Sequence, residues 1–139
     1  MTAKAPGSVF NPLRIDEDIV KDRMHLPYQN GREVFKNAVK RMPEAINVAL
    51  EHNNLSVDDV SLVVAHQANR RILEACAERM KLPMEKMYIN IQKYGNTTAA
   101  TIPIALCEAI EEGKFSKGDN IILTAFGAGY TWASAAIKW

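Results

Sequence analysis

Two polar residues stand where a strand is expected to give way to a helix, and both carry groups that can donate a hydrogen bond to a developing negative charge. His66 ends the apolar run from Val60 to Ala65, and Asn96 follows Gly95 ahead of an apolar helical pattern. Ligands of open α/β sheets bind just outside the carboxyl ends of the strands. An imidazole N–H and an amide N–H that meet there could stabilise an enolate or a tetrahedral oxyanion.

Each of these residues also has a purely structural interpretation, which the sequence leaves open. His66 taken alone suits a capping or core histidine. Asn96 suits a helix N-cap beside a glycine turn, although free backbone N–H groups and the positive end of the helix dipole at that point would also favour an anion. The occurrence of two such junctions favours a catalytic site over either structural role.

The two cysteines give no sign of redox or metal chemistry. Cys76 and Cys107 have no CxxC spacing, and each falls within an apolar helical pattern. Cysteines in such places usually pack in the core and do not act as nucleophiles. We therefore expect both side chains to be buried and reduced, no metal site, and a cytoplasmic protein.

Length and composition indicate a globular domain and exclude several classes of protein. The 139 residues suffice for one domain with its own core, and 47% of them are hydrophobic. A formal net charge of +1 gives no electrostatic case for nucleic-acid binding. No apolar run is long enough to span a membrane, and no signal peptide opens the sequence.

The elements that must position His66 and Asn96 alternate between strands and helices. Short apolar runs predict strands, and apolar stripes at a spacing of three to four residues predict helices. Strands are expected at residues 24–29, 60–65, 87–91, 120–126 and 130–138, and helices at residues 32–52, 69–80 and 98–112.

From this order we predict one α/β domain over residues 24–139, preceded by an N-terminal arm over residues 1–23. Right-handed crossovers would place the strands in one five-stranded mixed sheet of order β-α-β-α-β-α-β-β, flanked by helices. Only the last strand would be antiparallel, because a short link joins it to the strand before it.

The helix expected at residues 98–112 leaves almost no polar face in its first turns. A helix that is apolar all round is a buried helix, so this one should be covered by a second layer of protein. Its apolar residues are Ala99, Ala100, Ile102, Ile104, Ala105, Leu106, Ala109 and Ile110.

Three motifs in one order resemble a known family of condensing enzymes. They are His66-Gln67-Ala68-Asn69, the stretch Gly95 to Ala100 with Ile102-Pro103, and the stretch Ala125 to Gly129 with Thr131-Trp132. Together they closely resemble the C-terminal half of the 3-oxoacyl-[acyl-carrier-protein] synthase III family, which starts bacterial fatty-acid synthesis. Residues 30–36 match the same family, so the resemblance covers residues 26–139.

The resemblance implies a thiolase-like fold of two similar halves and a decarboxylative Claisen condensation. In the family, a cysteine takes an acyl group from acyl-CoA. A histidine and an asparagine then polarise the thioester of malonyl-[acyl carrier protein], whose decarboxylation gives the attacking enolate. The matching residues here are His66 and Asn96. No cofactor is implied beyond the coenzyme A and carrier-protein substrates.

The same resemblance implies binding roles for residues around this pair. Gly127 would lie in the loop that lines the oxyanion hole. The pantetheine tunnel would be lined by Gly31, Phe35 and Asn69. A basic patch at its mouth, formed by Lys36, Arg70 and Arg71, would face the acidic acyl carrier protein. For Arg70, a solvated helix face stays an open alternative to this binding role.

The family's nucleophilic cysteine belongs to an N-terminal half, which has no counterpart in this sequence. We therefore expect the chain alone to be inactive and to need that missing half, whether the chain is a truncated protein or a split-gene subunit. The alternative is a non-catalytic partner subunit that binds acyl carrier protein or a catalytic chain. The retained His66 and Asn96 favour the catalytic hypothesis. The apolar helix at 98–112 further predicts a twofold homo-oligomer built across it.

Overall fold

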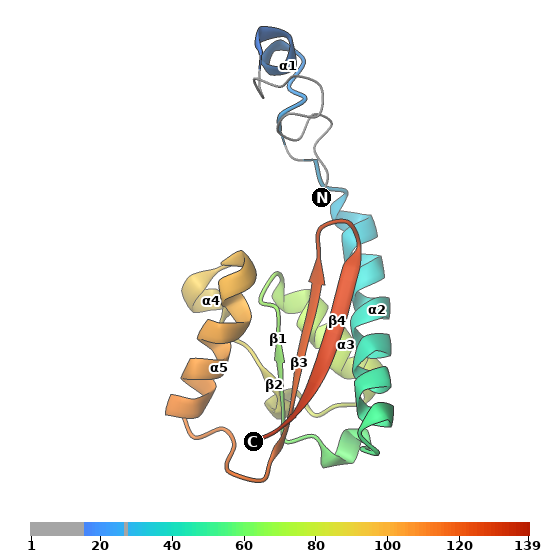
Figure 1. The fold of residues 1–139 in the computed structure, drawn as a ribbon, viewed down its shortest axis with the longest axis vertical. Coiled ribbons are helices and arrows are strands. Elements are labelled where there is room, and N and C mark those ends of the chain that lie inside the picture. The colour runs from blue at the N-terminus through green and yellow to red at the C-terminus, as the bar shows by residue number, and fades with distance from the viewer. Residues whose placement is uncertain (1–15, 27) are drawn as a thin grey trace.

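A computed structural model of the chain describes residues 16–26 and 28–139. The N-terminal arm expected over residues 1–23 lies mostly outside the described residues, and its boundary stays a prediction. The short helix α1, Glu17–Lys21, begins at Asp16, whose carboxylate accepts a hydrogen bond from the Ile19 N–H over 2.9 Å. This helix lies apart from the sheet, beyond the start of α2 (Figure 1).

The described residues form one mixed sheet of four strands. They are β1 (Leu62–Ala65), β2 (Met87–Tyr88), β3 (Asn120–Gly127) and β4 (Thr131–Lys138). The order across the sheet is β2-β1-β3-β4, with β1 parallel to both neighbours and β4 antiparallel to β3. The predicted mixed α/β sheet with an antiparallel last strand is confirmed.

The prediction of five strands is wrong for the described part of the chain, because the strand expected at residues 24–29 does not form. Residues 22–25 form turns, and Tyr28 makes only an isolated β-bridge. A proline has no N–H to donate to a ladder, so Pro27 weakens any strand that includes it. The sheet therefore starts at β1.

Two helices cover one face of the sheet (Figure 1). They are α2, Gly31–His52, and α3, Arg70–Met80. Each helix has an asparagine as its N-cap, just before its first residue. The Asn30 side-chain oxygen accepts the Glu33 N–H over 3.2 Å, and that of Asn69 accepts the Arg71 N–H over 2.9 Å. Their apolar stripes meet the sheet in the larger core cluster, whose buried members include Met42, Ile46, Leu50, Leu73, Cys76, Val63 and Ile122.

The opposite face is covered by a single long helix, α5 (Thr101–Glu111), which packs against β1. One continuous helix is expected at residues 98–112, but α5 begins only at Thr101. A 3₁₀ turn, Thr98–Ala100, precedes α5, and the one-turn helix α4, Ile91–Tyr94, lies further upstream. The smaller core cluster lies between α5 and the sheet, and its buried members are Leu62, Val64, Tyr88, Ala105, Ala109, Phe115 and Ile121.

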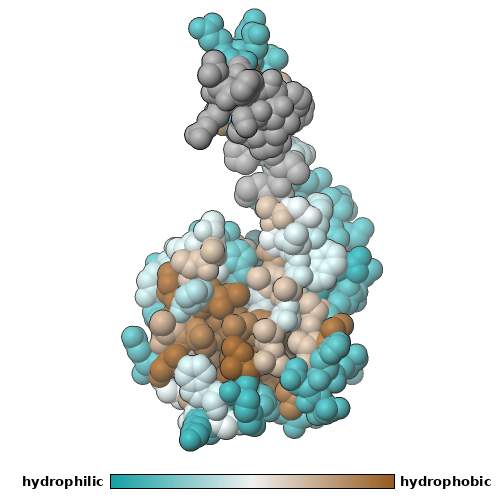
Figure 2. All heavy atoms as spheres, in the orientation of Figure 1, coloured by the Kyte–Doolittle hydropathy of each residue, from teal (hydrophilic) through white to brown (hydrophobic). Residues whose placement is uncertain are grey.

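One side of α5 and the neighbouring part of the sheet remain uncovered. Figure 2 shows apolar side chains gathered over α5 and the adjoining strands. Only Thr101, Ala105 and Ala109 of α5 are buried. The partly buried apolar residues beside them are Ile102, Leu106, Leu123 and Ile137. A single layer of helix on this face thus leaves it partly open, as the apolar pattern of the helix predicts.

The expected burial of Cys107 is wrong, whereas that of Cys76 is confirmed. Cys76 is buried between α2 and α3, but Cys107 is exposed on the outer side of α5. Since α5 packs through the stripe Thr101–Ala105–Ala109, a residue two positions after Ala105 points away from the sheet. None of the helices in the described residues is long and apolar enough to cross a membrane.

Candidate active site

His66 extends β1 by one backbone hydrogen bond and is held there by its buried neighbour. The His66 N–H donates to the Thr124 carbonyl of β3 over 2.8 Å. The Gln67 side chain donates to the carbonyls of Ala65 and Tyr88, over 2.9 and 3.0 Å, and its oxygen accepts the Asn90 N–H over 3.1 Å. This buried amide joins the ends of β1 and β2. The half-buried imidazole of His66 is therefore attached to a well-fixed edge of the sheet.

Asn96 is placed by a turn that only glycine adopts readily. Gly95 has φ of 67° and ψ of −157°, a conformation that a Cβ would strain. The Asn96 side-chain oxygen accepts the Thr98 N–H over 3.0 Å. Because a backbone N–H can be accepted only by the amide oxygen, the NH₂ group is turned the other way. It has no hydrogen-bond partner among the described residues.

Thr98 supports this turn in a strained backbone conformation. Its φ is 53°, in the left-handed region that β-branched residues rarely occupy. The left-handed backbone keeps Thr98 itself out of the right-handed helix α5, which begins at Thr101. Strained residues persist where the surrounding structure holds them, and they cluster at functional sites.

His66 and Asn96 border one pocket of about 540 Å³ at the carboxyl end of the sheet. The β3–β4 link, with Gly127 at the end of β3, forms another wall. None of the described residues that line the pocket is an Asp, Glu, Lys or Arg. The lining residues are Gln29, Val34, His66, Ala68, Asn96, Thr98, Ala99, Ala125, Phe126, Gly127, Ala128, Tyr130, Thr131, Trp132 and Ala133.

The imidazole of His66 is neutral at pH 7. Burial lowers its pKa below the ordinary 6.5, because the charged form loses solvation. Its Nδ1 atom lies 2.6 Å from the hydroxyl oxygen of Thr101, the first residue of α5. A neutral ring carries one N–H, on either Nδ1 or Nε2, and the Asn96 amide is a second donor. With the ring N–H on Nε2, the two donors can stabilise an oxyanion in this uncharged pocket.

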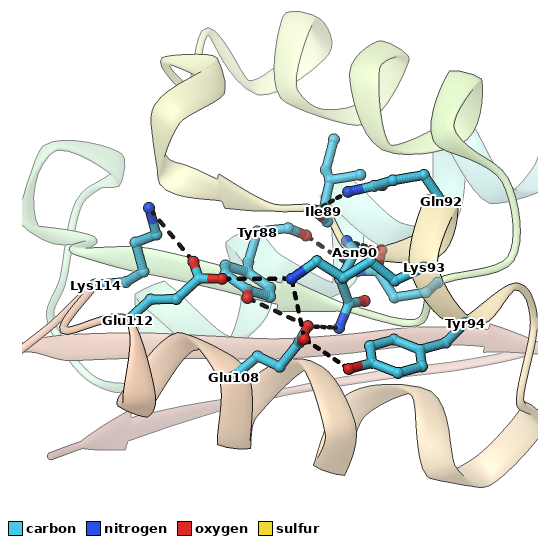
Figure 3. Close-up of polar contacts among 10 residues, drawn as sticks. Tyr88, Ile89, Asn90, Gln92, Lys93, Tyr94, Glu108, Glu112 and Lys114 are labelled. Atoms are coloured by element: carbon cyan, nitrogen blue, oxygen red, sulfur yellow. Dashed lines mark hydrogen bonds and ion pairs between the residues drawn. The ribbon is translucent and has the colours of Figure 1, made fainter.

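A polar network around Glu108 was not anticipated from the sequence (Figure 3). One carboxylate oxygen of Glu108 accepts Asn90 Nδ2 over 2.7 Å, and the other accepts the Tyr94 hydroxyl over 2.7 Å and Lys93 Nζ over 3.1 Å. These contacts tie the segment before Asn96 to α5. The available signal was a lone carboxylate in the middle of an otherwise apolar helical stretch.

The expected carrier-protein and pantetheine residues gather at the starts of α2 and α3, outside the lining of this pocket. The Arg71 guanidinium lies 5.8 Å from the centroid of the Phe35 ring, which joins the two helices. Arg70 is paired with Glu74 over 2.8 Å, whereas Lys36 and Gly31 are exposed. Asn69 caps α3. Their binding roles remain predictions.

Neither cysteine is placed to act as a nucleophile in this pocket. Burial raises the pKa of Cys76 to about 12, and its thiol lies 3.9 Å from the Ala38 carbonyl inside the core. Cys107 lies on the outer side of α5. The described residues also contain no group of three or more His, Cys, Asp or Glu that could hold a metal ion.

Comparison with known proteins identifies the family. Residues 50–139, which include His66, Asn96 and Gly127, match the family described as 3-oxoacyl-[acyl-carrier-protein] synthase III C terminal. The chain belongs to this family. The resemblance seen in the three sequence motifs is thereby confirmed, and the four-stranded sheet with its flanking helices is part of the synthase III fold.

Relatives of the synthase III family are similar over nearly the whole chain. A β-ketoacyl-[acyl-carrier-protein] synthase III from Koribacter versatilis is 48% identical over 133 residues, which is 96% of this chain and 39% of that protein. One from Roseiflexus sp. is 54% identical over 112 residues, covering 81% of this chain and 34% of that protein. The chain thus spans 34–39% of the length of these two relatives.

Solved synthase III structures share the fold. The enzyme from Thermus thermophilus superposes with a TM-score of 0.80 at 48% identity, over 83% of this chain and 36% of that one. The enzyme from Aquifex aeolicus gives a TM-score of 0.79 at 51% identity, over 81% of this chain and 36% of that one. In both cases the matching region is a minor part of the longer chain.

Proposed function

We propose that this chain is the C-terminal catalytic half of a 3-oxoacyl-[acyl-carrier-protein] synthase III. With an N-terminal half it would condense acyl-CoA with malonyl-[acyl carrier protein] in the cytoplasm, without a cofactor, at the start of fatty-acid synthesis. The observation that carries the proposal is the pairing of His66 and Asn96 in one uncharged pocket, with the NH₂ group of Asn96 turned away from its own turn and a neutral imidazole that donates when its N–H is on Nε2.

The two donors act on the thioester carbonyl of the malonyl group. The bond between its carboxylate carbon and the α-carbon breaks, CO₂ leaves, and the electron pair moves onto the carbonyl oxygen as an enolate. Hydrogen bonds from His66 Nε2 and Asn96 Nδ2 stabilise that oxygen more than the neutral carbonyl. The enolate carbon then attacks an acyl-thioester on the N-terminal half, and the cysteine thiolate of that half leaves.

The open apolar face is where this half requires a partner. The uncovered side of α5 and the adjoining strands carries Ile102, Leu106, Leu123 and Ile137, which are only partly buried. The resemblance to the family supports an N-terminal half as the layer that packs against this face. That half would also supply the nucleophile, since Cys76 is buried in the core, Cys107 is exposed on α5, and neither lines the pocket.

The basic cluster at the starts of α2 and α3 is proposed as the docking point of the acidic carrier protein. Arg71 and Lys36 are exposed and have no ion pair among the described residues, whereas Arg70 is already paired with Glu74. Gly31, Phe35 and Asn69 lie in the same region and are proposed to contact the pantetheine arm.

The alternative is a non-catalytic subunit that binds carrier protein or a catalytic chain. Such a subunit would need the basic cluster and the apolar face but would have no use for a neutral histidine beside an oriented amide donor. The two proposals differ in what happens when the donors are removed, because a scaffold would keep its function.

The deciding experiment supplies an N-terminal half from a synthase III relative, fused to the chain or as a separate polypeptide. His66→Ala and Asn96→Ala should each lower malonyl decarboxylation by roughly 10²–10³, while acyl transfer to the cysteine stays near the unmutated rate. His52→Ala and Asn47→Ala, on the exposed side of α2, are the matched controls. Decarboxylation at the unmutated rate in both active-site variants would refute the catalytic assignment.

A further inference from the structure

Thr101 has one hydroxyl proton and two acceptors within reach. It is the first residue of α5, and 3% of its surface is exposed. Its Oγ1 lies 2.6 Å from His66 Nδ1 and 3.0 Å from the carbonyl oxygen of Thr98. The proton can be donated to only one of the two at a time. The choice fixes which nitrogen of the neutral imidazole carries its own proton.

The two arrangements have opposite consequences for the pocket. If the hydroxyl donates to the Thr98 carbonyl, Nδ1 must carry a proton and donate it to Oγ1, and Nε2 presents a lone pair. If the hydroxyl donates to Nδ1, that nitrogen is an acceptor and Nε2 carries the N–H. Only the second arrangement gives an imidazole donor for an oxyanion, whereas the first would repel it.

We propose that Thr101 is a positioning residue that donates its hydroxyl proton to His66 Nδ1 and thereby holds the imidazole in the tautomer with its N–H on Nε2. This inference rests on the proposed function, because the functional demand is for a donor at Nε2. It is carried by the juxtaposition of a buried hydroxyl with one ring nitrogen of the catalytic histidine.

The geometry favours this direction of donation. The Thr101 Oγ1 atom lies 2.6 Å from His66 Nδ1, so the ring nitrogen is the nearer of the two acceptors. The competing contact is the threonine back-bond to the Thr98 carbonyl, three residues earlier, and it is longer at 3.0 Å. Burial keeps the ring neutral, so its single proton must reside on one nitrogen.

Nitrogen-15 NMR of histidine side chains tests the tautomer directly, on the chain alone and joined to an N-terminal half. The His66 signals are assigned by their loss in His66→Gln, since the chain has three histidines. The unmutated protein and Thr101→Ser should show a protonated Nε2 and an acceptor Nδ1. Thr101→Val, which keeps the shape but removes the hydroxyl, should shift the population toward the other tautomer.

Kinetics of the joined protein give a second readout. Thr101→Val should lower the rate of malonyl decarboxylation by about 10–10², leave acyl transfer unchanged, and be rescued by Thr101→Ser. Thr97→Val is the matched control, because the buried hydroxyl of Thr97 has no partner among the described residues. This control should leave both rates and the tautomer unchanged.

The outcomes separate this inference from the proposed function. A protonated Nδ1 in the unmutated protein, or a tautomer that Thr101→Val leaves unchanged, would overturn the positioning role even if His66→Ala abolishes decarboxylation. Activity that survives His66→Ala would instead refute the function. The spectrum of the unmutated protein decides the tautomer even if Thr101→Val destabilises the fold.

Discussion

The hydroxyl of Tyr94 donates to one carboxylate oxygen of Glu108 over 2.7 Å, and this contact ties the segment that leads to Asn96 to the middle of α5. Asn90 and Lys93 donate to the same carboxylate. Four residues of one polar cluster thus hold the segment that leads to Asn96, the proposed catalytic amide, two positions after Tyr94. Loss of these contacts should therefore lower the stability of the fold and disturb the position of the Asn96 side chain.

The Glu108 cluster should make the protein sensitive to acid. Hydrogen bonds from Asn90 and Tyr94, and then the Lys93 ammonium, lower the pKa of Glu108 to about 2 from an ordinary 4.5. Because the folded-state pKa is the lower one, the stabilisation is fully present above pH 4.5 and is lost as the pH falls toward 2. Melting temperatures measured between neutral pH and pH 2 should fall less steeply for Glu108→Gln in that window.

The control for this titration is Glu78→Gln. Glu78 is exposed on α3 and its carboxylate has no hydrogen bond or ion pair among the described residues. This variant should keep the steep loss of stability between pH 4.5 and 2. Equal slopes for Glu108→Gln and the unmutated chain would contradict the role given to the cluster.

The two cysteines should be dispensable for catalysis and should differ in reactivity. The exposed Cys107 should be alkylated by iodoacetamide while Cys76 stays unmodified in the folded protein, because burial raises the pKa of Cys76 to about 12. Mass spectrometry of the tryptic peptides measures both. Cys76→Ser and Cys107→Ser should leave condensation intact once an N-terminal half is supplied.

The chain alone should form no condensation product from acyl-CoA and malonyl-[acyl carrier protein], because the proposed acyl acceptor is a cysteine of the N-terminal half. Product formed by the purified chain and abolished by either cysteine variant would show that the nucleophile resides here after all.

Arg71→Glu should weaken the use of carrier-protein substrates much more than that of free coenzyme A thioesters. The exposed guanidinium of Arg71 lies over the Phe35 ring, where an acidic partner can approach both α2 and α3. The difference should shrink at high salt, because exposed charges are screened. The measurement is kcat/KM for malonyl-[acyl carrier protein] and malonyl-CoA at low and high ionic strength.

Arg79→Glu provides the matched charge change for this test. Arg79 is exposed in the last turn of α3, at the opposite end of the helix from Arg71. It should leave the ratio of the two substrates unchanged. An equal loss for both substrates in Arg71→Glu would indicate a folding defect in place of a lost docking contact.

In the absence of its partner half, the chain should associate through the open face of α5. Ile110 is 44% exposed there, and contiguous apolar surface is rarely left bare on a monomer. We expect a twofold homodimer with an interface above about 1,000 Å², seen by sedimentation or light scattering. Ile102→Glu and Ile110→Glu should dissociate it, and addition of an N-terminal half should displace it.

Val48→Glu is the control for the homodimer. Val48 is 53% exposed on α2, which covers the other face of the sheet. This variant should not change the association state. A monomer at high micromolar concentration for the unmutated chain would refute the expected dimer.

Local patterns in the sequence are enough to predict the order and type of most elements and the two catalytic candidates. Apolar periodicity is a local property, so it located α2, α3 and the strands β1 and β3 within a few residues. The carboxyl ends of parallel strands share one edge of a sheet, which is why the sequence predicts His66 and Asn96 in one pocket.

The side chains that support His66 and Asn96 could not be predicted, because they come from distant parts of the chain. The partner of His66 is Thr101, 35 residues away, and the partners of Glu108 come from a segment 14 to 18 residues before it. Such contacts depend on how α5 is rotated against the sheet, and the same rotation leaves Cys107 outside. An apolar pattern on all sides of a helix carries no information about that rotation, because every orientation buries a similar surface.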